Sequence, residues 1–458
     1  MKLKIDAKLD CGFMPMSLVC REMRENTRDN GQDLIIAVER NQGYTYVYKT
    51  RIYKDNTGHD EENCAFIDRI AKTLLWVAGG YKVTIAGSEI VGEYIKNTFC
   101  HGGTRDFDAR FMERVYEKPF EVNVCNLKHA PKEKSSASPV GKHLDGCRIG
   151  FDAGGSDRKV SAVVNGETVY SEEVVWFPKI NSDPNYHYEG ILSAMKTAAS
   201  HMPRVDAIGV SSAGVYIDNK IMVASLFIKV NDDDFEKKVK NMYINVAREV
   251  GENIPIEVAN DGDVTALAGA MSLEDNGILG IAMGTSEAAG YVDMDGNITG
   301  WLNELAFAPV DFNKDSAIDD WSGDYGCGSR YFSQDAVIKL APYANIELDE
   351  NLSPAEKLKV VQNLMKDGDE RAKAIYETIG AYFGYSLAYY AEFYDIKHVL
   401  IMGRVTSGEG GEILLNKARE VIAIEFPELN QKITLNIPDE KARRVGQSVA
   451  AASLPKIN

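Results

Sequence analysis

The feature that most restricts the fold of this chain is a pattern that occurs twice. Each copy has an apolar strand, a turn of glycine and hydroxyl residues, a second strand and a glycine-containing hairpin. The first copy, RIGFDAGGSDRKVSAVVNGETVY, breaks at Gly154-Gly155-Ser156, and the second follows the apolar strand 277–283 and breaks at Gly284-Thr285-Ser286. The copies lie 132 residues apart, counted from Asp152 to Gly284. This repetition predicts a duplicated α/β fold with two ligand loops that face each other.

The first turn is suited to holding a phosphate. Its adjacent glycines lack Cβ atoms, so a ligand can approach the backbone closely, and the amides of such a turn form an anion-binding concavity. Asp152 places an acceptor where a hydrated cation could sit beside the phosphate, and Ser156 and Lys159 add a hydroxyl and a positive charge. The GxxxxGK[ST] and GxGxxG patterns are both absent. Taken alone, the pattern is also that of an ordinary glycine hairpin.

Composition limits the class of protein. A chain of 458 residues with 45% apolar and 26% charged residues is globular and has room for two or three domains. The net charge of −17 argues against nucleic acid or an anionic membrane as a partner. The seven cysteines are dispersed with no CxxC pair, which indicates reduced thiols. Without an apolar signal core or membrane-length run, we expect a cytoplasmic protein with no membrane partner.

The amino-terminal third differs in character from the rest. Residues 1–130 are expected to form a small α+β domain of unknown role, with no helix-turn-helix pattern. Residues 131–145 are rich in lysine, serine and proline and lack apolar periodicity, so we expect a linker there. The chain ends with small apolar residues at helical spacing, which predicts a helix able to pack against another part of the protein.

Two later junctions between a strand and a helix carry candidate functional groups. The segment Asn260-Asp261-Gly262-Asp263 follows the short strand 255–259, at a point where helix amides stabilise negative charge. A carboxylate there could accept a proton as general base, or Asp261 or Asp263 could simply cap the helix. Gly403 begins a glycine-containing loop after the strand 398–402, where a flat nucleoside could lie against the backbone.

The order of these segments resembles the ROK family of sugar kinases, within the actin, Hsp70 and hexokinase-like group of ATP-binding proteins. The resemblance covers about residues 146–458, and each motif match is partial. Four segments carry it: the first phosphate motif at 150–164, the Asn-Asp-Ala-Asn segment at 260–263, the start of the second phosphate motif at 284–286, and the adenosine segment at 395–408.

The resemblance implies a duplicated actin-like fold, of the ribonuclease H-like kind, with two lobes and an interlobe cleft. The first lobe would comprise residues 146–259 with the carboxy-terminal helix 442–458, and the second lobe residues 260–441. The small amino-terminal α+β domain lies outside the resemblance. A homodimer would be usual for relatives.

The resemblance also implies a role for each matching residue. Asp261 would be the general base that deprotonates a sugar hydroxyl for attack on the γ-phosphate of ATP, and Asp152 would hold Mg²⁺ through water. The groups that would bind ATP and its phosphates are Gly154, Gly155, Ser156, Lys159, Gly284, Thr285, Ser286 and Gly403. The groups that would bind the sugar are Asn260, Asp261, Glu304 and Gln334.

The sequence departs from the family pattern at several positions. Glu287 follows the second turn and would add negative charge close to a phosphate. Ala306-Phe307 replaces the Gly-His pair that usually follows the sugar-binding glutamate. The cysteine-rich zinc segment is reduced to residues 326–330, and Gln334 stands where a glutamate is expected. We therefore predict no structural zinc and an altered sugar pocket.

Two hypotheses remain open from the sequence. The first is an ATP-dependent kinase acting on a hydroxyl of a hexose or related sugar, with ATP and the sugar as its small-molecule partners. The alternative is a catalytically weak nucleotide- or sugar-binding sensor, whose amino-terminal domain carries the output. An ATPase that activates another enzyme has only the glycine-serine turn in its support. The acidic charge and the missing helix-turn-helix disfavour a DNA-binding repressor.

Overall fold

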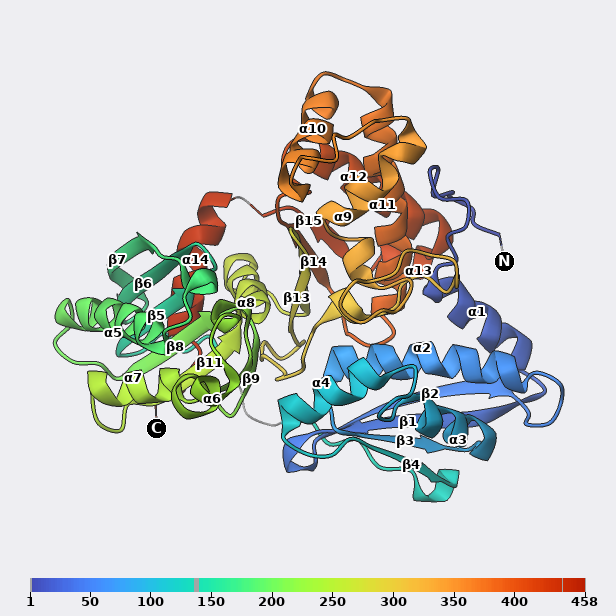
Figure 1. Ribbon diagram of the computed structural model, residues 1–458, viewed down its shortest axis with the longest axis horizontal. Coiled ribbons are helices and arrows are strands. Elements are labelled where there is room, and N and C mark those ends of the chain that lie inside the picture. Colours follow the sequence, from blue (N-terminus) through green and yellow to red (C-terminus); the bar gives the residue numbers. More distant parts are fainter. Residues whose placement is uncertain (1, 136–139, 439, 458) are drawn as a thin grey trace. The chain divides into compact units, whose positions relative to one another are not determined.

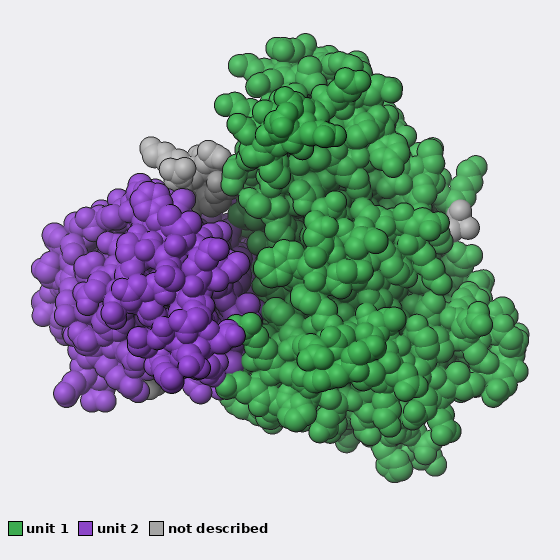
Figure 2. Space-filling model, in the orientation of Figure 1, with its two compact units in different colours: residues 1–136, 281–289, 300–437 green, residues 137–280, 290–299, 438–458 purple. Residues whose placement is uncertain are grey.

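The computed structural model describes residues 2–135, 140–438 and 440–457. The chain divides into two compact units (Figure 2). Unit 1 comprises residues 1–136, 281–289 and 300–437, and unit 2 comprises residues 137–280, 290–299 and 438–458. Within the expected linker 131–145, residues 136–139 lie outside the described residues.

The elements are labelled in Figure 1. The strands are β1 (Gly31–Glu39), β2 (Thr45–Tyr53), β3 (Lys82–Ala86), β4 (Glu121–Cys125), β5 (Cys147–Ala153), β6 (Asp157–Val164), β7 (Glu167–Val175), β8 (Ala207–Ser212), β9 (Val215–Ile217), β10 (Lys220–Val223), β11 (Ile256–Asn260), β12 (Ile278–Met283), β13 (Glu287–Val292), β14 (His398–Met402) and β15 (Thr434–Asn436). The α-helices are α1 (Met16–Thr27), α2 (Asp60–Ala78), α3 (Glu89–Thr98), α4 (Asp106–Tyr116), α5 (Pro184–Ser200), α6 (Asp232–Asp234), α7 (Met242–Val250), α8 (Asp261–Leu273), α9 (Gln334–Leu340), α10 (Pro354–Lys366), α11 (Glu370–Tyr390), α12 (Glu409–Glu425), α13 (Pro427–Asn430) and α14 (Glu440–Ala452).

Unit 2 is built on a five-stranded sheet with the order β11-β8-β5-β6-β7. Strands β11, β8 and β5 are parallel, and β6 and β7 continue the sheet in antiparallel pairing. In this register Asp152 lies opposite Ser211, and Asn260 lies opposite Ser212. The carboxyl ends of three neighbouring parallel strands therefore meet at one edge of the sheet, which is where α/β proteins bind ligands.

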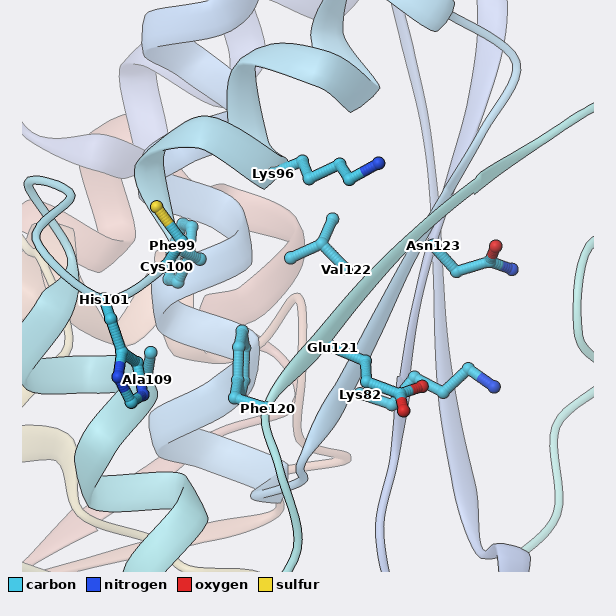
Figure 3. Close-up of a pocket in the computed structure, with 10 residues that line it drawn as sticks. All are labelled: Lys82, Lys96, Phe99, Cys100, His101, Ala109, Phe120, Glu121, Val122 and Asn123. Carbon is cyan, nitrogen blue, oxygen red and sulfur yellow. The ribbon is translucent and has the colours of Figure 1, made fainter.

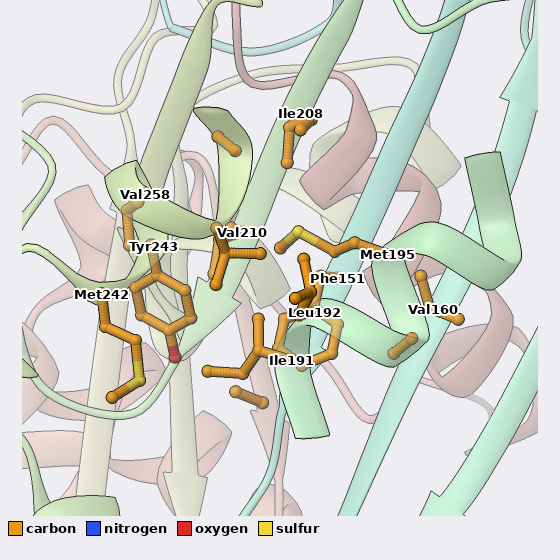
Figure 4. Packing of buried hydrophobic residues seen from close by; sticks show 14 of the residues in the cluster. Phe151, Val160, Ile191, Leu192, Met195, Ile208, Val210, Met242, Tyr243 and Val258 are labelled. Carbon is orange, nitrogen blue, oxygen red and sulfur yellow. The ribbon is translucent and has the colours of Figure 1, made fainter. Parts of the chain in front are cut away.

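Alternation along the strands directs side chains to both faces of this sheet. Phe151 and Val210 are fully buried in an apolar cluster with side chains from α5 and α7, among them Met195 (Figure 4). Gly150 and Gly209 face the other way, toward α14, where an added Cβ would overlap the helix backbone. The absence of these two side chains is what allows α14 to pack closely on the sheet.

Unit 1 contains an amino-terminal sheet with the order β2-β1-β3-β4. Leu34, Ile36 and Val38 alternate along β1 and are at most 1% exposed. Helix α2 packs on β1 and β2, and α3 packs on β3 and β4 (Figure 1). The alternating pattern of β1 is that of a strand with one buried face.

A second sheet has the order β13-β12-β14-β15. Helix α11 packs against α12, and α1 packs against α11 as well. The aromatic side chains of α11 belong to the core: Tyr382 and Tyr389 are fully buried, and Phe13 lies edge-on to Tyr382 at 4.6 Å between ring centroids. Amino-terminal residues therefore share a core with α11.

The structure confirms the predicted hairpin and corrects one predicted helix. Asn165 and Gly166 have φ of 49° and 86°, as a turn of this type requires. The sequence predicts one helix over 235–250, and most of this stretch is helical, but Phe235–Val239 forms a π-helix and α7 begins only at Met242. The carbonyl of Lys240 accepts from the amide of Ile221 at 2.9 Å, so β10 takes a group that a continuous helix would use.

Among residues 2–135, 140–438 and 440–457, none of the helices combines the length and apolar character that crossing a bilayer requires.

Candidate functional site

The carboxylate of Asp152 lies at the end of β5 in unit 2. Its side chain is buried, and the hydroxyl of Ser211 donates to Oδ1 at 2.9 Å. Burial raises the pKa of Asp152 to about 6; the hydrogen bond from Ser211 opposes this rise, and the charge of Asp261 adds to it. The structure therefore brings the two carboxylates that the sequence singled out into electrostatic contact.

The first glycine turn follows Asp152 directly and is held in place by Trp176. The indole Nε1 donates to the carbonyl of Gly154 at 2.8 Å, and the backbone amide of Trp176 donates to the carbonyl of Ser156 at 3.1 Å. An added Cβ on Gly154 would lie 2.7 Å from the carbonyl oxygen of Asp157. The turn thus needs glycine at this position for steric reasons.

Lys159 lies beside Asp152 rather than over the turn. The two residues are opposite each other in the ladder between β5 and β6, and the charge of Lys159 lowers the pKa of Asp152. The ammonium of Lys159 pairs with Asp157 at 3.5 Å. Its positive charge is therefore already shared with carboxylates of the protein.

The segment Asn260–Asp263 joins β11 to α8. Asn260 is the N-cap: its side chain accepts from the amide of Gly262 at 2.7 Å and donates to the carbonyl of Gly214 at 2.8 Å. Asp263 is buried and accepts from the amide of Tyr291 at 3.0 Å. Asn260 therefore caps the helix and Asp263 binds β13, whereas the side chain of Asp261 does neither.

Asp261 is the first residue of α8 and is half-buried. Burial raises the pKa of its carboxyl, while the amide of Gly262, at 3.1 Å from Oδ1, and the charge of Lys179 oppose the rise. A raised pKa brings a carboxylate closer to the range in which it accepts a proton effectively at neutral pH.

Lys179 is a residue that the sequence analysis missed. It lies in the 3₁₀ turn Pro178–Ile180, after β7, and is exposed. A Cβ on Gly155 would lie 2.9 Å from its Cε and 3.1 Å from its Nζ, so the ammonium lies against the glycine turn. No sequence motif includes this lysine. It lies near Gly155 only because the chain returns along the hairpin of β6 and β7.

The second glycine turn, in unit 1, is also assembled from distant segments. The amide of Gln334 donates to the carbonyl of Gly284 at 2.9 Å. Gly403 has φ of 105°, and an added Cβ would overlap the backbone of Met283. The structure therefore brings Gly284, Gln334 and Gly403 together, and Arg404 reaches the hydroxyl of Thr285 at 3.5 Å.

Glu287, which the sequence placed near a phosphate, is directed into the interior of unit 1. It is 3% exposed, and within the described part of the chain neither carboxylate oxygen has a hydrogen-bond partner. Burial raises its pKa to about 8; the nearby hydroxyl of Tyr390 opposes the rise, and the charge of Glu304 adds to it. At pH 7 this carboxyl is therefore mainly neutral and does not add a full charge to the turn.

The loop that carries Glu304 is held by the end of α2. The amide of Glu304 donates to the carbonyl of Trp76 at 2.9 Å, and that of Asn303 donates to the carbonyl of Val77 at 3.1 Å. Phe307, in the position of the family's histidine, stacks on Trp76 at 4.2 Å between centroids. Nothing in the sequence indicated that the amino-terminal residues hold this loop.

A buried ion cluster lies directly before the segment 326–330, which stands in the position of the family's zinc motif. Asp324 pairs with Arg69 at 2.7 Å, with Lys72 at 2.9 Å and with Arg105 at 2.7 Å. Although burial raises it, these three charges hold the pKa of Asp324 below its usual value. In the described residues, no group of three or more His, Cys, Asp or Glu side chains could hold a metal ion.

A separate pocket of about 570 Å³ opens in the amino-terminal part of unit 1 (Figure 3). It contains none of the predicted site residues. Its lining consists of Lys82, Lys96, Phe99, Cys100, His101, Ala109, Phe120, Glu121, Val122 and Asn123.

These features define a mixed α/β protein with several sheets and with glycine-containing turns at the ends of strands. The ROK family model matches residues 148–425, more than half of the chain. The protein belongs to the ROK family, and its fold matches the actin-like two-lobe fold of that family.

Solved structures with a similar fold have little sequence in common with this chain. A ROK-family transcriptional regulator, described as a homologue of the E. coli MLC protein, has a TM-score of 0.51 at 18% identity and covers 68% of this chain and 79% of its own. A ROK hexokinase from Thermus thermophilus has a TM-score of 0.49 at 18% identity, over 66% of this chain and 97% of its own. A ROK-family glucokinase from Streptomyces griseus, in complex with glucose and AMPPNP, has a TM-score of 0.46 at 19% identity. It covers 66% of this chain and 98% of its own. Comparison with curated proteins gives no match.

Proposed function

We propose that this protein is a kinase that transfers the γ-phosphoryl group of ATP to a hydroxyl of a hexose or a related sugar. The observation that carries the proposal is the placement of Asp152 and Asp261 beside the first glycine turn. Both carboxylates lie at the carboxyl ends of parallel strands of one sheet, and their charges influence each other. A sugar kinase needs one carboxylate for the metal–phosphate end of the reaction and one for the attacking hydroxyl.

Asp261 is assigned the role of general base. It is half-buried at the start of α8, its pKa is raised by burial, and Asn260 rather than Asp261 caps the helix. In this proposal Asp261 takes the proton of the sugar hydroxyl as that oxygen attacks the γ-phosphate. Asn260, Glu304 and Gln334 bind and orient the other sugar hydroxyls, which converts binding energy into correct positioning.

The two glycine turns are assigned to the phosphates of ATP. Backbone amides of Gly154–Ser156 and Gly284–Ser286 would donate to phosphate oxygens, and Gly403 would leave room for adenosine. The close approach of Gly403 to the backbone of Met283 supports a shared nucleotide region in unit 1. Catalysis of this kind depends mainly on alignment and on neutralising phosphate charge.

Mg²⁺ is the metal expected with ATP, and the donor chemistry of Asp152 fits it. Mg²⁺ usually binds through one or two carboxylates together with water and substrate phosphates. Asp152 supplies one carboxylate, and Ser211 orients it with a hydrogen bond at 2.9 Å. When bound, the ion neutralises phosphate charge. The chain's own contribution is to hold Asp152 ionised and correctly turned.

A second candidate function has one observation in its favour. Phe307 is packed in an aromatic cluster with Trp76 and Phe111, so this part of the expected sugar pocket offers no polar side chain from Ala306-Phe307. A protein altered in this way could bind a nucleotide or sugar with little turnover and act as a sensor.

The test is an ADP-release assay with ATP and magnesium against a panel of hexoses, amino sugars and polyols. We expect sugar-stimulated turnover that falls roughly 10²- to 10⁴-fold in Asp261→Asn, because loss of a general base acts on the chemical step. The affinity of the variant for ATP should stay close to that of the wild type. Asp233→Asn, at a side chain that is 91% exposed, is the matched control and should leave turnover unchanged.

The outcomes separate the two candidates. Binding of ATP or sugar without turnover by the wild type would favour the sensor. An Asp261→Asn variant as active as the wild type would remove the base role from this residue.

A further inference from the structure

We infer that Lys179 is a phosphate-binding residue, whose ammonium holds a phosphate of ATP over the turn Gly154–Gly155. The identity of the ligand rests on the proposed function, and the position of the lysine rests on the structure alone. Neither the glycine turn nor the strand that precedes it contains this residue, which lies 24 positions after Gly155.

The ammonium of Lys179 is in the right place to act together with the turn. A Cβ on Gly155 would come within 3.1 Å of Nζ, so the space that glycine leaves open borders the charge. An ammonium beside the main chain of a glycine turn can complete an anion site, because the amides of such turns bind anions. Lysine commonly binds phosphate as a point charge of this kind.

The backbone that carries Lys179 is anchored, although the side chain is exposed. His187 of α5 is 0% exposed, and its Nε2 lies 3.0 Å from the carbonyl of Pro178 and 3.2 Å from that of Leu226. The amide of Phe177, two residues before Lys179, donates to the hydroxyl of Tyr186 at 2.9 Å. A fixed backbone reduces the entropy that is lost when the lysine is ordered by a ligand.

The charge of Lys179 is also uncommitted. Within the described part of the chain it forms no hydrogen bond and no ion pair, whereas Lys159, on the neighbouring strand, pairs with Asp157 at 3.5 Å. An exposed lysine without an ion-pair partner contributes little to the stability of a protein. A structural role therefore does not explain why this ammonium lies against the glycine turn. We therefore assign the ammonium of Lys179 to ligand binding.

A second consequence concerns the general base. The charge of Lys179 lowers the pKa of Asp261, against the effect of burial. Lys179 is thus placed to act on both ends of the transfer: it would bind the phosphate and keep the carboxylate ionised. Removal of the charge should weaken phosphate binding.

The test compares binding of ATP, ADP and adenosine by isothermal titration calorimetry, with magnesium present, for the full-length protein and its variants. We expect Lys179→Met to weaken ATP binding about 10- to 100-fold and adenosine binding less than about threefold, since one charged contact to phosphate is lost. Lys179→Arg should recover most of the affinity. Lys196→Met, at an exposed lysine of α5 in the same unit, should bind like the wild type.

Binding and turnover distinguish this inference from the proposed function. If the wild type binds ATP but transfers no phosphate, the kinase proposal fails while the affinity ratio still supports or rejects Lys179. Equal ATP affinity in wild type and Lys179→Met would overturn the inference even if sugar phosphorylation is intact. An equal loss of ATP and adenosine affinity would also overturn it, because a phosphate contact must discriminate between them. A wild type that binds no ATP overturns both.

Discussion

Replacing Glu287 with glutamine should change how the stability of this protein depends on pH. The carboxyl is 3% exposed, and its pKa is about 8 against an ordinary value of 4.5, because of burial and the nearby charge of Glu304. Between these values the folded state keeps a proton that the unfolded state has lost. The free energy of unfolding of the wild type therefore falls as pH rises through this window, and the full loss is reached above about pH 8.

The magnitude follows from the difference in pKa. From 4.5 to about 8 is about 3.5 pH units, and at about 1.36 kcal/mol per unit the loss reaches about 5 kcal/mol. Relaxation and water entry on ionisation make this an upper bound. Glutamine keeps the shape of the side chain without the titration. The stability of Glu287→Gln relative to the wild type should therefore rise by roughly 3 kcal/mol between pH 5.5 and pH 8.

The assay is urea denaturation at several pH values between 5.5 and 8.5, followed by tryptophan fluorescence. The quantity of interest is the difference between variant and wild type at each pH, because other titrating groups then cancel. Glu425→Gln is the control: this carboxylate is also buried but pairs with Lys4 at 3.2 Å, so its loss should destabilise at every pH. Parallel profiles for Glu287→Gln and the wild type would refute the reasoning.

Three further predictions concern activity and packing. Ser211→Ala removes the hydrogen bond that lowers the pKa of Asp152, so the acid limb of kcat/KM, expected near the pKa of about 6, should move to higher pH; an unchanged limb would show that ionisation of Asp152 does not control activity. Trp76→Ala should lower stability by about 3–5 kcal/mol, since it empties a fully buried site in the aromatic cluster, and a urea midpoint close to that of the wild type would contradict this. Gly209→Ala should destabilise the protein by about 1–3 kcal/mol, since its Cβ would overlap the backbone of α14. Gly280→Ala is the control and should have the smaller effect, because its Cβ would have no contact closer than 3.6 Å. Equal thermal midpoints for the two variants would argue against the close packing of α14.

Local structure was largely predictable from the sequence. The strand that contains Asp152, the strand 398–402 and the hairpin at Asn165-Gly166 all rest on patterns within a short stretch of chain. The cap of α3 is equally local, because the hydroxyl of Ser88 accepts from the amide of Val91 at 3.2 Å. The break within the helical stretch 235–250 is not local: the amide of Ile221, 19 residues before Lys240, donates to the Lys240 carbonyl.

The candidate site was predictable only in part. Asp152, Asp261 and the glycine turns stand out because each ends a strand or begins a helix, and such positions can be read from the chain. Lys179 and Trp76 carry no such mark. Their significance depends on what the folded chain places beside them, namely Gly155 for the lysine and the loop of Glu304 for the tryptophan.

The sequence by itself determined the strands, the turns and the set of polar groups at strand ends, because these depend on side-chain periodicity and on the backbone freedom of glycine. Only the tertiary structure decided which of those groups act together. It paired Asp152 with Ser211 and turned Glu287 into the interior. It also placed Lys179 against the first turn, with no ion pair to any of the residues that the structure describes. Burial and charge separation set the protonation of a carboxylate, and both are properties of neighbours that are distant in sequence.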